Sequence, residues 1–229
     1  MASIPSSGIV SALPIGLEVG PKRKVFAQVV EWPGWCRSGR DEAAAIGAVE
    51  SVMARYRAAV GDLAAPLGSG APAFTIMERV EGGTTTDFGA LERVLASDRR
   101  PLEPGEPERL AAFLDACWAA FDRAFAAIAV GDRETTPAVG RGPEAMREHV
   151  IDTARYHLSW LMRPVPKPDS TDVAQVDAQQ RKLLRGAVLG LPLGNPFSSE
   201  RHPGPYVVRR ECWHTLDHAW ELENRFRPS

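Results

Sequence analysis

The sequence has little cysteine, little net charge and no long apolar run, and each shortage excludes a class of protein. Only three cysteines occur in 229 residues, at Cys36, Cys117 and Cys212, and they form no CxxC pair. This odd, widely spaced set argues against a disulfide framework and favours a reducing, cytoplasmic compartment. The N-terminal apolar stretch lacks an early basic region and is interrupted by Pro14, so we expect neither a signal peptide nor a membrane span.

The charge balance excludes partners that are recognised through a strong electrostatic field. The chain has 27 lysines and arginines and 29 acidic residues, which give a formal net charge of −2. Such a balance offers no global attraction to nucleic acid or to an anionic membrane. We therefore expect no nucleic-acid partner and no membrane partner.

The first hundred residues predict a small α/β module. Residues 1–21 are rich in Ser, Gly and Pro and predict an irregular lead-in. A helix is expected to begin after Asp41, a natural N-cap, and to end at Gly61. β-branched and aromatic content predicts strands over 24–31, 35–38 and 73–80. The following stretch VEGGTTTDFG predicts a loop, which either lines a ligand cleft between domains or forms an ordinary interdomain turn.

The remaining residues carry almost only helical signals. The stretch RRPLEPGEPE is typical of a linker, and apolar positions at helical spacing then predict four helices, which begin near Pro107, Pro143, Asp172 and Pro205. The predicted fold class is α+β, with a small N-terminal β-β-α-β module over 1–100 followed by a C-terminal four-helix bundle over 101–229. An exposed face of such a bundle would suit a homodimer.

The segment RRECWHTLDHAWELENR carries two of the five histidines. His214 and His218 are four residues apart, so both side chains lie on one helix face. Trp213 and Trp220 border them, either as core anchors or as a substrate wall. Imidazoles at the border of a core need partners, because an unsatisfied buried polar group is costly. The pair is therefore part of a divalent-metal site, or it is hydrogen-bonded to carboxylates or carbonyls.

A third metal ligand has candidates elsewhere in the sequence. His149 and His157 share one predicted helix, but eight residues turn their directions roughly 80° apart, so they would not easily serve the same ion. His202 precedes a proline and is typical of a loop. Cys212 projects to a different face from the histidine pair and is a poor ligand. Cys36 is either a thiol activated by a nearby cation or a buried strand cysteine.

The helical histidine in EHVID, followed by HTLDH on the last predicted helix, resembles the pattern of the DinB-like family. The resemblance covers about residues 105–229 and implies a four-helix bundle with a three-histidine metal site. Carried over residue by residue, it implies His149, His214 and His218 as the metal ligands. It also implies a coordination position that is open to water or substrate. Several DinB-like bundles are thiol S-transferases that use a low-molecular-weight thiol.

On this resemblance we expect a divalent-metal-binding protein, either a thiol S-transferase or a hydrolase, that acts on a small molecule. Three neutral imidazoles suit Zn²⁺, Ni²⁺ or Fe²⁺. Asp217 and Glu221 would hold ring N–H groups or act as catalytic acid–base residues. The alternative is a non-catalytic module that binds a ligand or a partner, with the bundle as its scaffold.

The first module resembles HicB-like domains. In KVFAQVVEWPGWCRSGRDEAAAIGAV, a strand leads to the turn Pro33-Gly34, Gly39 precedes the helix cap Asp41, and an Ala-rich helix follows. HicB-like domains bind a partner toxin, and a separate part of those proteins binds DNA. Nothing in this sequence resembles that DNA-binding part, so the resemblance implies the fold only.

Overall fold

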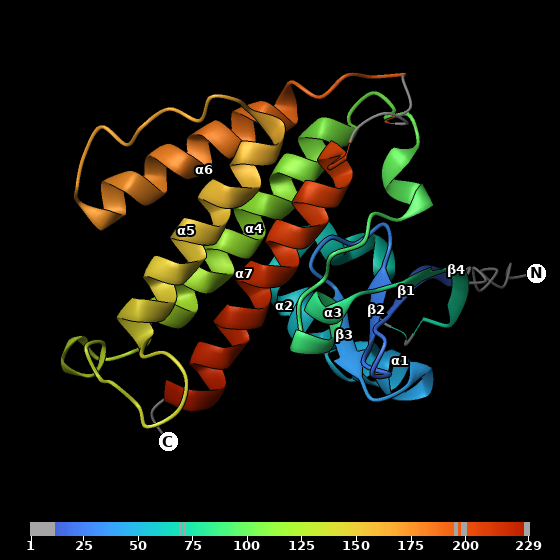
Figure 1. Cartoon of the computed structure of the whole chain (residues 1–229), viewed down its shortest axis with the longest axis horizontal. Coiled ribbons are helices and arrows are strands. Elements are labelled where there is room, and N and C mark those ends of the chain that lie inside the picture. Colours follow the sequence, from blue (N-terminus) through green and yellow to red (C-terminus); the bar gives the residue numbers. More distant parts are fainter. Residues whose placement is uncertain (1–11, 69, 71, 195–196, 198–200, 227–229) are drawn as a thin grey trace, which may run out of the picture.

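A sheet formed by the N-terminal segment lies against one side of four long helices (Figure 1). The structure is a computed structural model that describes residues 12–68, 70, 72–194, 197 and 201–226. The sheet segment contains β1 (Leu13–Val19), β2 (Val25–Val29), β3 (Cys36–Gly39), α1 (Glu42–Ser51), α2 (Met53–Val60) and β4 (Phe74–Glu81). The long helices are α4 (Glu106–Ala126), α5 (Pro143–Leu161), α6 (Val173–Leu189) and α7 (Gly204–Phe226). The connections contain η1 (Gly61–Leu67), α3 (Thr84–Phe88), η2 (Ala96–Arg99) and η3 (Val130–Asp132).

The sheet has the strand order β3-β2-β1-β4. β1 pairs antiparallel with β2 and parallel with β4, and β2 pairs antiparallel with β3. The three strands predicted from the sequence are confirmed as β2, β3 and β4. The α+β class is confirmed with them, because helices dominate the rest of the described chain.

The expectation of an irregular lead-in over residues 1–21 is wrong for the second half of this range, which contains β1. Residues up to 11 lie outside the described part of the chain. The strand lies between β2 and β4 in the sheet. Pro14 has no N–H, yet its carbonyl accepts a hydrogen bond from the Val30 N–H at 3.0 Å. Ile15 and Leu17 are buried, so their packing outweighs the poor strand propensity of the proline and glycine beside them. The predicted β-β-α-β module therefore has one more strand than expected.

The helix predicted after Asp41 forms in two pieces. The Asp41 side chain caps α1 by accepting a hydrogen bond from a backbone N–H three residues on, at 2.8 Å. The chain leaves helical geometry at Val52, where α1 ends and α2 follows. Trp35 holds both pieces, because its indole N–H donates to the Val49 carbonyl at 2.8 Å and its ring stacks on Tyr56 with centroids 5.1 Å apart.

The four helices predicted for the second half are confirmed as α4 to α7, with small differences at their ends. α4 packs against α7 and α6, and α5 packs against α6 and α7. One hydrophobic core continues across the predicted boundary near residue 100, and the Trp32 ring lies edge-on to Phe113 of α4 with centroids 5.9 Å apart. Within the described part of the chain, none of the helices combines the length and apolar character needed to cross a bilayer.

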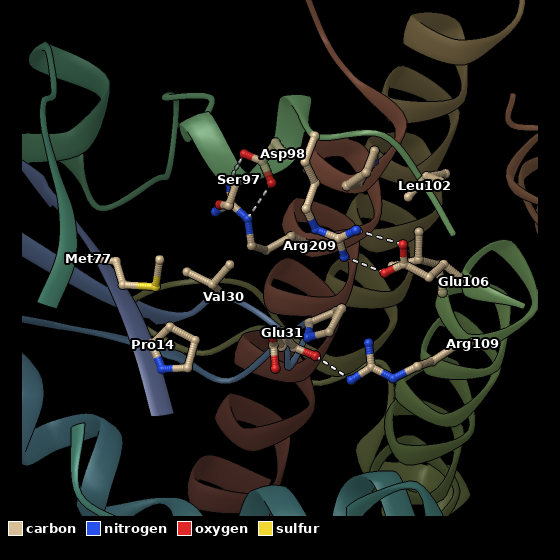
Figure 2. A pocket seen from close by; sticks show the side chains of 14 residues that line it. Pro14, Val30, Glu31, Met77, Ser97, Asp98, Leu102, Glu106, Arg109 and Arg209 are labelled. Carbon is tan, nitrogen blue, oxygen red and sulfur yellow. Dashed lines mark hydrogen bonds and ion pairs between the residues drawn. The ribbon is translucent and has the colours of Figure 1, made fainter. Parts of the chain in front are cut away.

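Buried polar groups join α7 to the segment after β4, and that segment to the sheet. Arg209 of α7 forms an ion pair with Asp98 of η2, and Figure 2 shows the two side chains facing each other at the wall of a pocket. Glu18 of β1 is fully buried and accepts hydrogen bonds from the Thr86 hydroxyl at 2.6 Å and the Arg93 N–H at 3.1 Å. Burial raises the pKa of Glu18, and these hydrogen bonds offset part of the rise. The predicted loop VEGGTTTDFG thus contains a short helix, α3, which is hydrogen-bonded to the buried Glu18 carboxylate.

The first prediction concerns the turn Pro33-Gly34, whose second position requires glycine. Gly34 has φ +90°, and a Cβ there would lie 2.9 Å from Leu216 and 3.3 Å from Cys212. Gly34→Ala is expected to lower the free energy of unfolding by roughly 2–4 kcal/mol, from left-handed strain and overpacking together. Gly61→Ala is the matched control, since Gly61 has φ +57° with open space around it, and should cost only about 1–2 kcal/mol. Equal losses of unfolding free energy in the two variants, measured by urea unfolding, would contradict the packing argument.

Candidate metal centre

The last long helix supplies two imidazoles to the candidate site. Trp213, Leu216 and Trp220 of α7 are buried, so their packing fixes how the helix is rotated. This favours core anchors over a substrate wall for the two tryptophans. The rotation leaves His214 and His218 at the border of the core, on one face as predicted, with ring centroids 4.6 Å apart.

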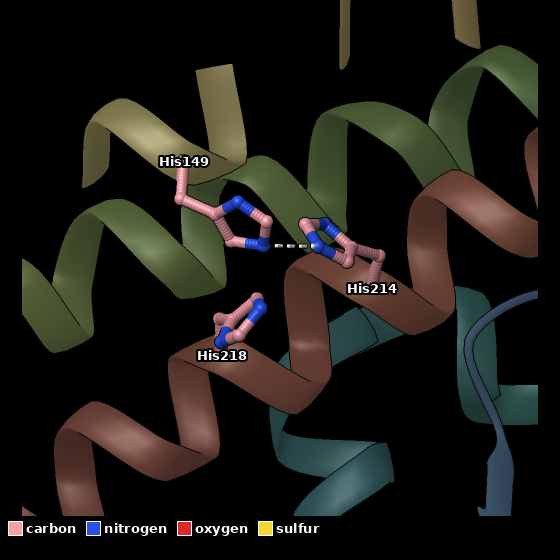
Figure 3. A group of neighbouring side chains, drawn as sticks. All are labelled: His149, His214 and His218. Carbon is pink, nitrogen blue, oxygen red and sulfur yellow. Dashed lines mark hydrogen bonds between the residues drawn. The ribbon is translucent and has the colours of Figure 1, made fainter. Parts of the chain in front are cut away.

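α5 supplies the third imidazole. Met146 and Val150 are buried on this helix, and their packing turns His149 toward α7. The ring centroid of His149 lies 5.0 Å from that of His214 and 5.1 Å from that of His218. One ligand nitrogen from each of the three residues lies within 4.8 Å of the others, and Figure 3 shows the rings turned toward a common space. The structure therefore brings together the three residues that the resemblance implies.

The environment keeps two of these imidazoles uncharged near neutral pH. Burial lowers the pKa of His149 to about 4, and the nearby Arg141 guanidinium contributes to the decrease. Burial also places the pKa of His214 well below its ordinary value, with smaller contributions from the neighbouring histidines. A neutral imidazole is the form that binds a metal ion, so these two rings need not lose a proton first.

Glu221 contacts the triad in the way the sequence predicts. Its carboxylate lies 3.1 Å from His218 Nδ1, one turn along α7. The same carboxylate forms an ion pair with Arg225, whose guanidinium also donates to the Val139 carbonyl at 2.6 Å. A carboxylate on Nδ1 fixes the ring orientation and leaves Nε2 as the free ligand atom. The catalytic role predicted for Glu221 stays a prediction.

Asp217 lies on the other side of α7, toward the sheet. Its carboxylate accepts a hydrogen bond from the Arg37 guanidinium of β3 at 2.7 Å. Arg37 in turn lies over the Trp220 ring, 4.0 Å from its centroid. Among the described residues, the contacts of Asp217 do not include the three imidazoles. The structure therefore gives it a place in the contact between α7 and the sheet, and its predicted catalytic role stays a prediction.

The geometry of the three rings fits a divalent ion. Two nitrogens bound to one tetrahedral zinc at about 2.0–2.1 Å lie about 3.4 Å apart. The separation between His149 Nε2 and His214 Nε2 is 3.1 Å, close to that value. The nitrogen of His218 lies within 4.8 Å of both, so a small rotation of this side chain suffices. His214 Nδ1 is buried and has no hydrogen-bond partner among the described residues, so no protein group ties this ring in another orientation.

His157 belongs to a second network beside the triad. Its Nδ1 lies 2.7 Å from the Glu211 carboxylate, and its Nε2 accepts from the Arg210 Nε–H at 3.2 Å. Glu211 also accepts a hydrogen bond from the Trp118 indole at 3.0 Å. The ring centroid of His157 is 6.2 Å from that of His214, as its different direction on α5 predicts. Sequence reasoning missed this network; its signal is a pair of charged residues, Arg210 and Glu211, within an apolar stretch of α7.

The cysteines do not join the candidate site. Cys36 is buried on β3, and burial raises the pKa of its thiol far above the ordinary value. This favours the interpretation of Cys36 as a buried strand cysteine over an activated thiol. Cys212 is buried on the face of α7 toward Cys117, and burial raises its pKa as well. Neither thiol is present as the thiolate that binds metals.

Comparison of this chain with models of protein families, with curated proteins and with solved structures finds no match. The DinB-like and HicB-like resemblances therefore stay predictions from sequence motifs. What supports a function is the geometry of the chain's own residues, above all the convergence of His149 with the pair on α7.

Proposed function

We propose that this chain is a divalent-metal-binding protein of the DinB-like kind, with α4 to α7 as its four-helix bundle and the sheet as a HicB-like module. The mutual packing of α4 with α6 and α7, and of α5 with α6 and α7, supports the bundle. The single observation that carries the metal is the meeting of three imidazoles from two helices, with ligand nitrogens within 4.8 Å of one another.

His149, His214 and His218 would hold the ion. Three neutral nitrogens suit Zn²⁺, Ni²⁺ or Fe²⁺ and disfavour Mg²⁺ and Ca²⁺, which prefer oxygen ligands. The carboxylate of Glu221 would keep the His218 ring in its ligating orientation. When bound, such an ion supplies Lewis acidity, which lowers the pKa of a bound thiol or water.

The reaction that we propose is transfer of a low-molecular-weight thiol to a small molecule, with hydrolysis as the related alternative. Both reactions need a nucleophile that carries negative charge near neutral pH. The three cysteines of the chain are buried and do not provide one, so an external thiol or water is the nucleophile that fits this site. Glu221, next to His218 and 33% exposed, is the carboxylate placed to exchange a proton with that nucleophile.

Elemental analysis of the protein, purified without an affinity tag, tests the proposal. We expect about one equivalent of a transition metal per chain, because three preformed nitrogen ligands retain such an ion through purification. An assay of thiol consumption with electrophilic small molecules should then show activity that a chelator abolishes. Protein that contains no metal and takes up none on addition of zinc would overturn the proposal and favour a non-catalytic binding module.

A further inference from the structure

A large polar pocket is lined by Arg210, the residue that donates a hydrogen bond to His157. Its volume is about 610 Å³, and its walls come from α5, α7 and the segment that follows β4. Four arginines line it, against one carboxylate from Glu92; they are Arg93, Arg99, Arg201 and Arg210. Glu92 lies 3.8 Å from Arg93, and Arg99 donates a hydrogen bond to the Phe197 carbonyl at 2.7 Å, so the described lining holds more arginines than carboxylates. The pocket therefore carries a marked excess of positive charge in a chain whose net charge is −2.

One wall of the pocket is a stack of aromatic rings. The rings of Trp160 and His202 are nearly parallel, with centroids 4.1 Å apart. The Tyr206 ring of α7 lies beside this pair, with its centroid 5.8 Å from that of His202 and 5.9 Å from that of Trp160. Burial lowers the pKa of His202, and the charges of Arg201 and Arg210 lower it further, so the ring is neutral near pH 7. The wall is thus aromatic and bordered by cations.

Arg210 is held rigidly between this wall and the buried network. Its Nε–H donates to His157, whose other ring nitrogen faces the buried Glu211 carboxylate. Its guanidinium also lies 5.6 Å from the centroid of the Trp160 ring. Among the described residues, no carboxylate pairs directly with Arg210. A guanidinium that is oriented in advance and lacks an ionic partner is suited to bind an anion.

We propose that this pocket binds an anionic group, a carboxylate or a phosphate, carried on a planar apolar group. The anion would face Arg210 and Arg93, and the planar group would lie along the Trp160 wall. His157 contacts Arg210, and its ring centroid lies 6.2 Å from that of His214. The anion pocket would hold the non-reacting end of a substrate next to the metal centre. That last assignment rests on the proposed function, whereas anion binding itself does not.

Calorimetric titration of the chelator-treated full chain tests the pocket without any metal. Benzoate and phenyl phosphate are the probes, and benzamide is the neutral control of the same shape as benzoate. We expect saturable binding of at least one of the two anions, at least tenfold tighter than benzamide. The tighter of the two identifies the anion, and either order supports the proposal. Added salt should weaken binding, because screening reduces the attraction between the charges.

Variants locate the binding. Arg210→Gln should weaken anion binding about tenfold or more, and Arg93→Gln, at a half-exposed position, by a smaller factor. Arg185→Gln is the matched control, because it removes the same charge at an exposed position, where Arg185 pairs with Asp115. His218→Ala should keep anion binding while it loses metal, which separates this proposal from the proposed function. Absence of saturable anion binding, or unchanged affinity in both pocket variants, would overturn it.

Discussion

His214→Ala is expected to lower the affinity of the chain for Zn²⁺ by at least about 100-fold. Loss of a residue that only supports a ligand typically costs 10–100-fold in metal affinity, and loss of a ligand should cost at least the upper end. His214 is central to the site, since its ring centroid lies 5.0 Å from that of His149 and 4.6 Å from that of His218. Competition with a colorimetric zinc chelator at neutral pH, on untagged protein, measures the change.

The control is a histidine outside the triad. His202→Ala should keep the affinity of the wild type, because His202 stacks on Trp160 in the neighbouring pocket. His149→Ala is the most informative further variant, since His149 is the ligand that comes from α5. If its zinc affinity equals that of the wild type, two imidazoles of one helix bind the ion alone, and the convergence of α5 with α7 has no part in the site. Circular dichroism spectra that match the wild type exclude loss of the fold as the cause.

The local part of this site is predictable from the sequence, and the long-range part is not. His214 and His218 share a helix face because of helix periodicity alone, and no other segment is needed to place them together. His149 and His214 are separated by 65 residues. Their contact depends on how α5 packs against α7, so the sequence offers both His149 and His157 as third ligands, and only the resemblance to a known family selects His149.

The difference between local and long-range contacts also explains which parts of the fold the sequence predicts. Asp41 and Asp172 cap helices as expected, because a cap is a contact with the next few residues. β1 was missed because Pro14 and Gly16 weaken the local strand signal. The strand pairs with β2, which follows it in the chain, and with β4, more than fifty residues later, and Gly16 lies so close to Leu95 that a Cβ would approach it to 2.5 Å. Pairing on both sides decides such an element, and local propensity does not.

Asp98→Ala is expected to cause the largest loss of stability, about 3–5 kcal/mol in the free energy of unfolding. The change leaves Arg209 charged, 3% exposed and without its ionic partner. Burial by itself lowers the pKa of Arg209, but attraction and hydrogen bonding to Asp98 raise it above its ordinary value. The variant also removes the acceptor of the Leu95 N–H, which lies 2.7 Å from the Asp98 carboxylate. Guanidinium unfolding followed by tryptophan fluorescence measures the loss.

Asp115→Ala is the matched control for this loss. It removes a carboxylate from an exposed ion pair with Arg185, and exposed pairs contribute about 0–1 kcal/mol. The double variant Asp98→Ala/Arg209→Met should recover part of the stability, because an apolar side chain does not need a buried partner. A loss in Asp98→Ala no larger than in Asp115→Ala would mean that water reaches Arg209. In that case the pair would not be the contact that fixes α7, and with it His214, against η2.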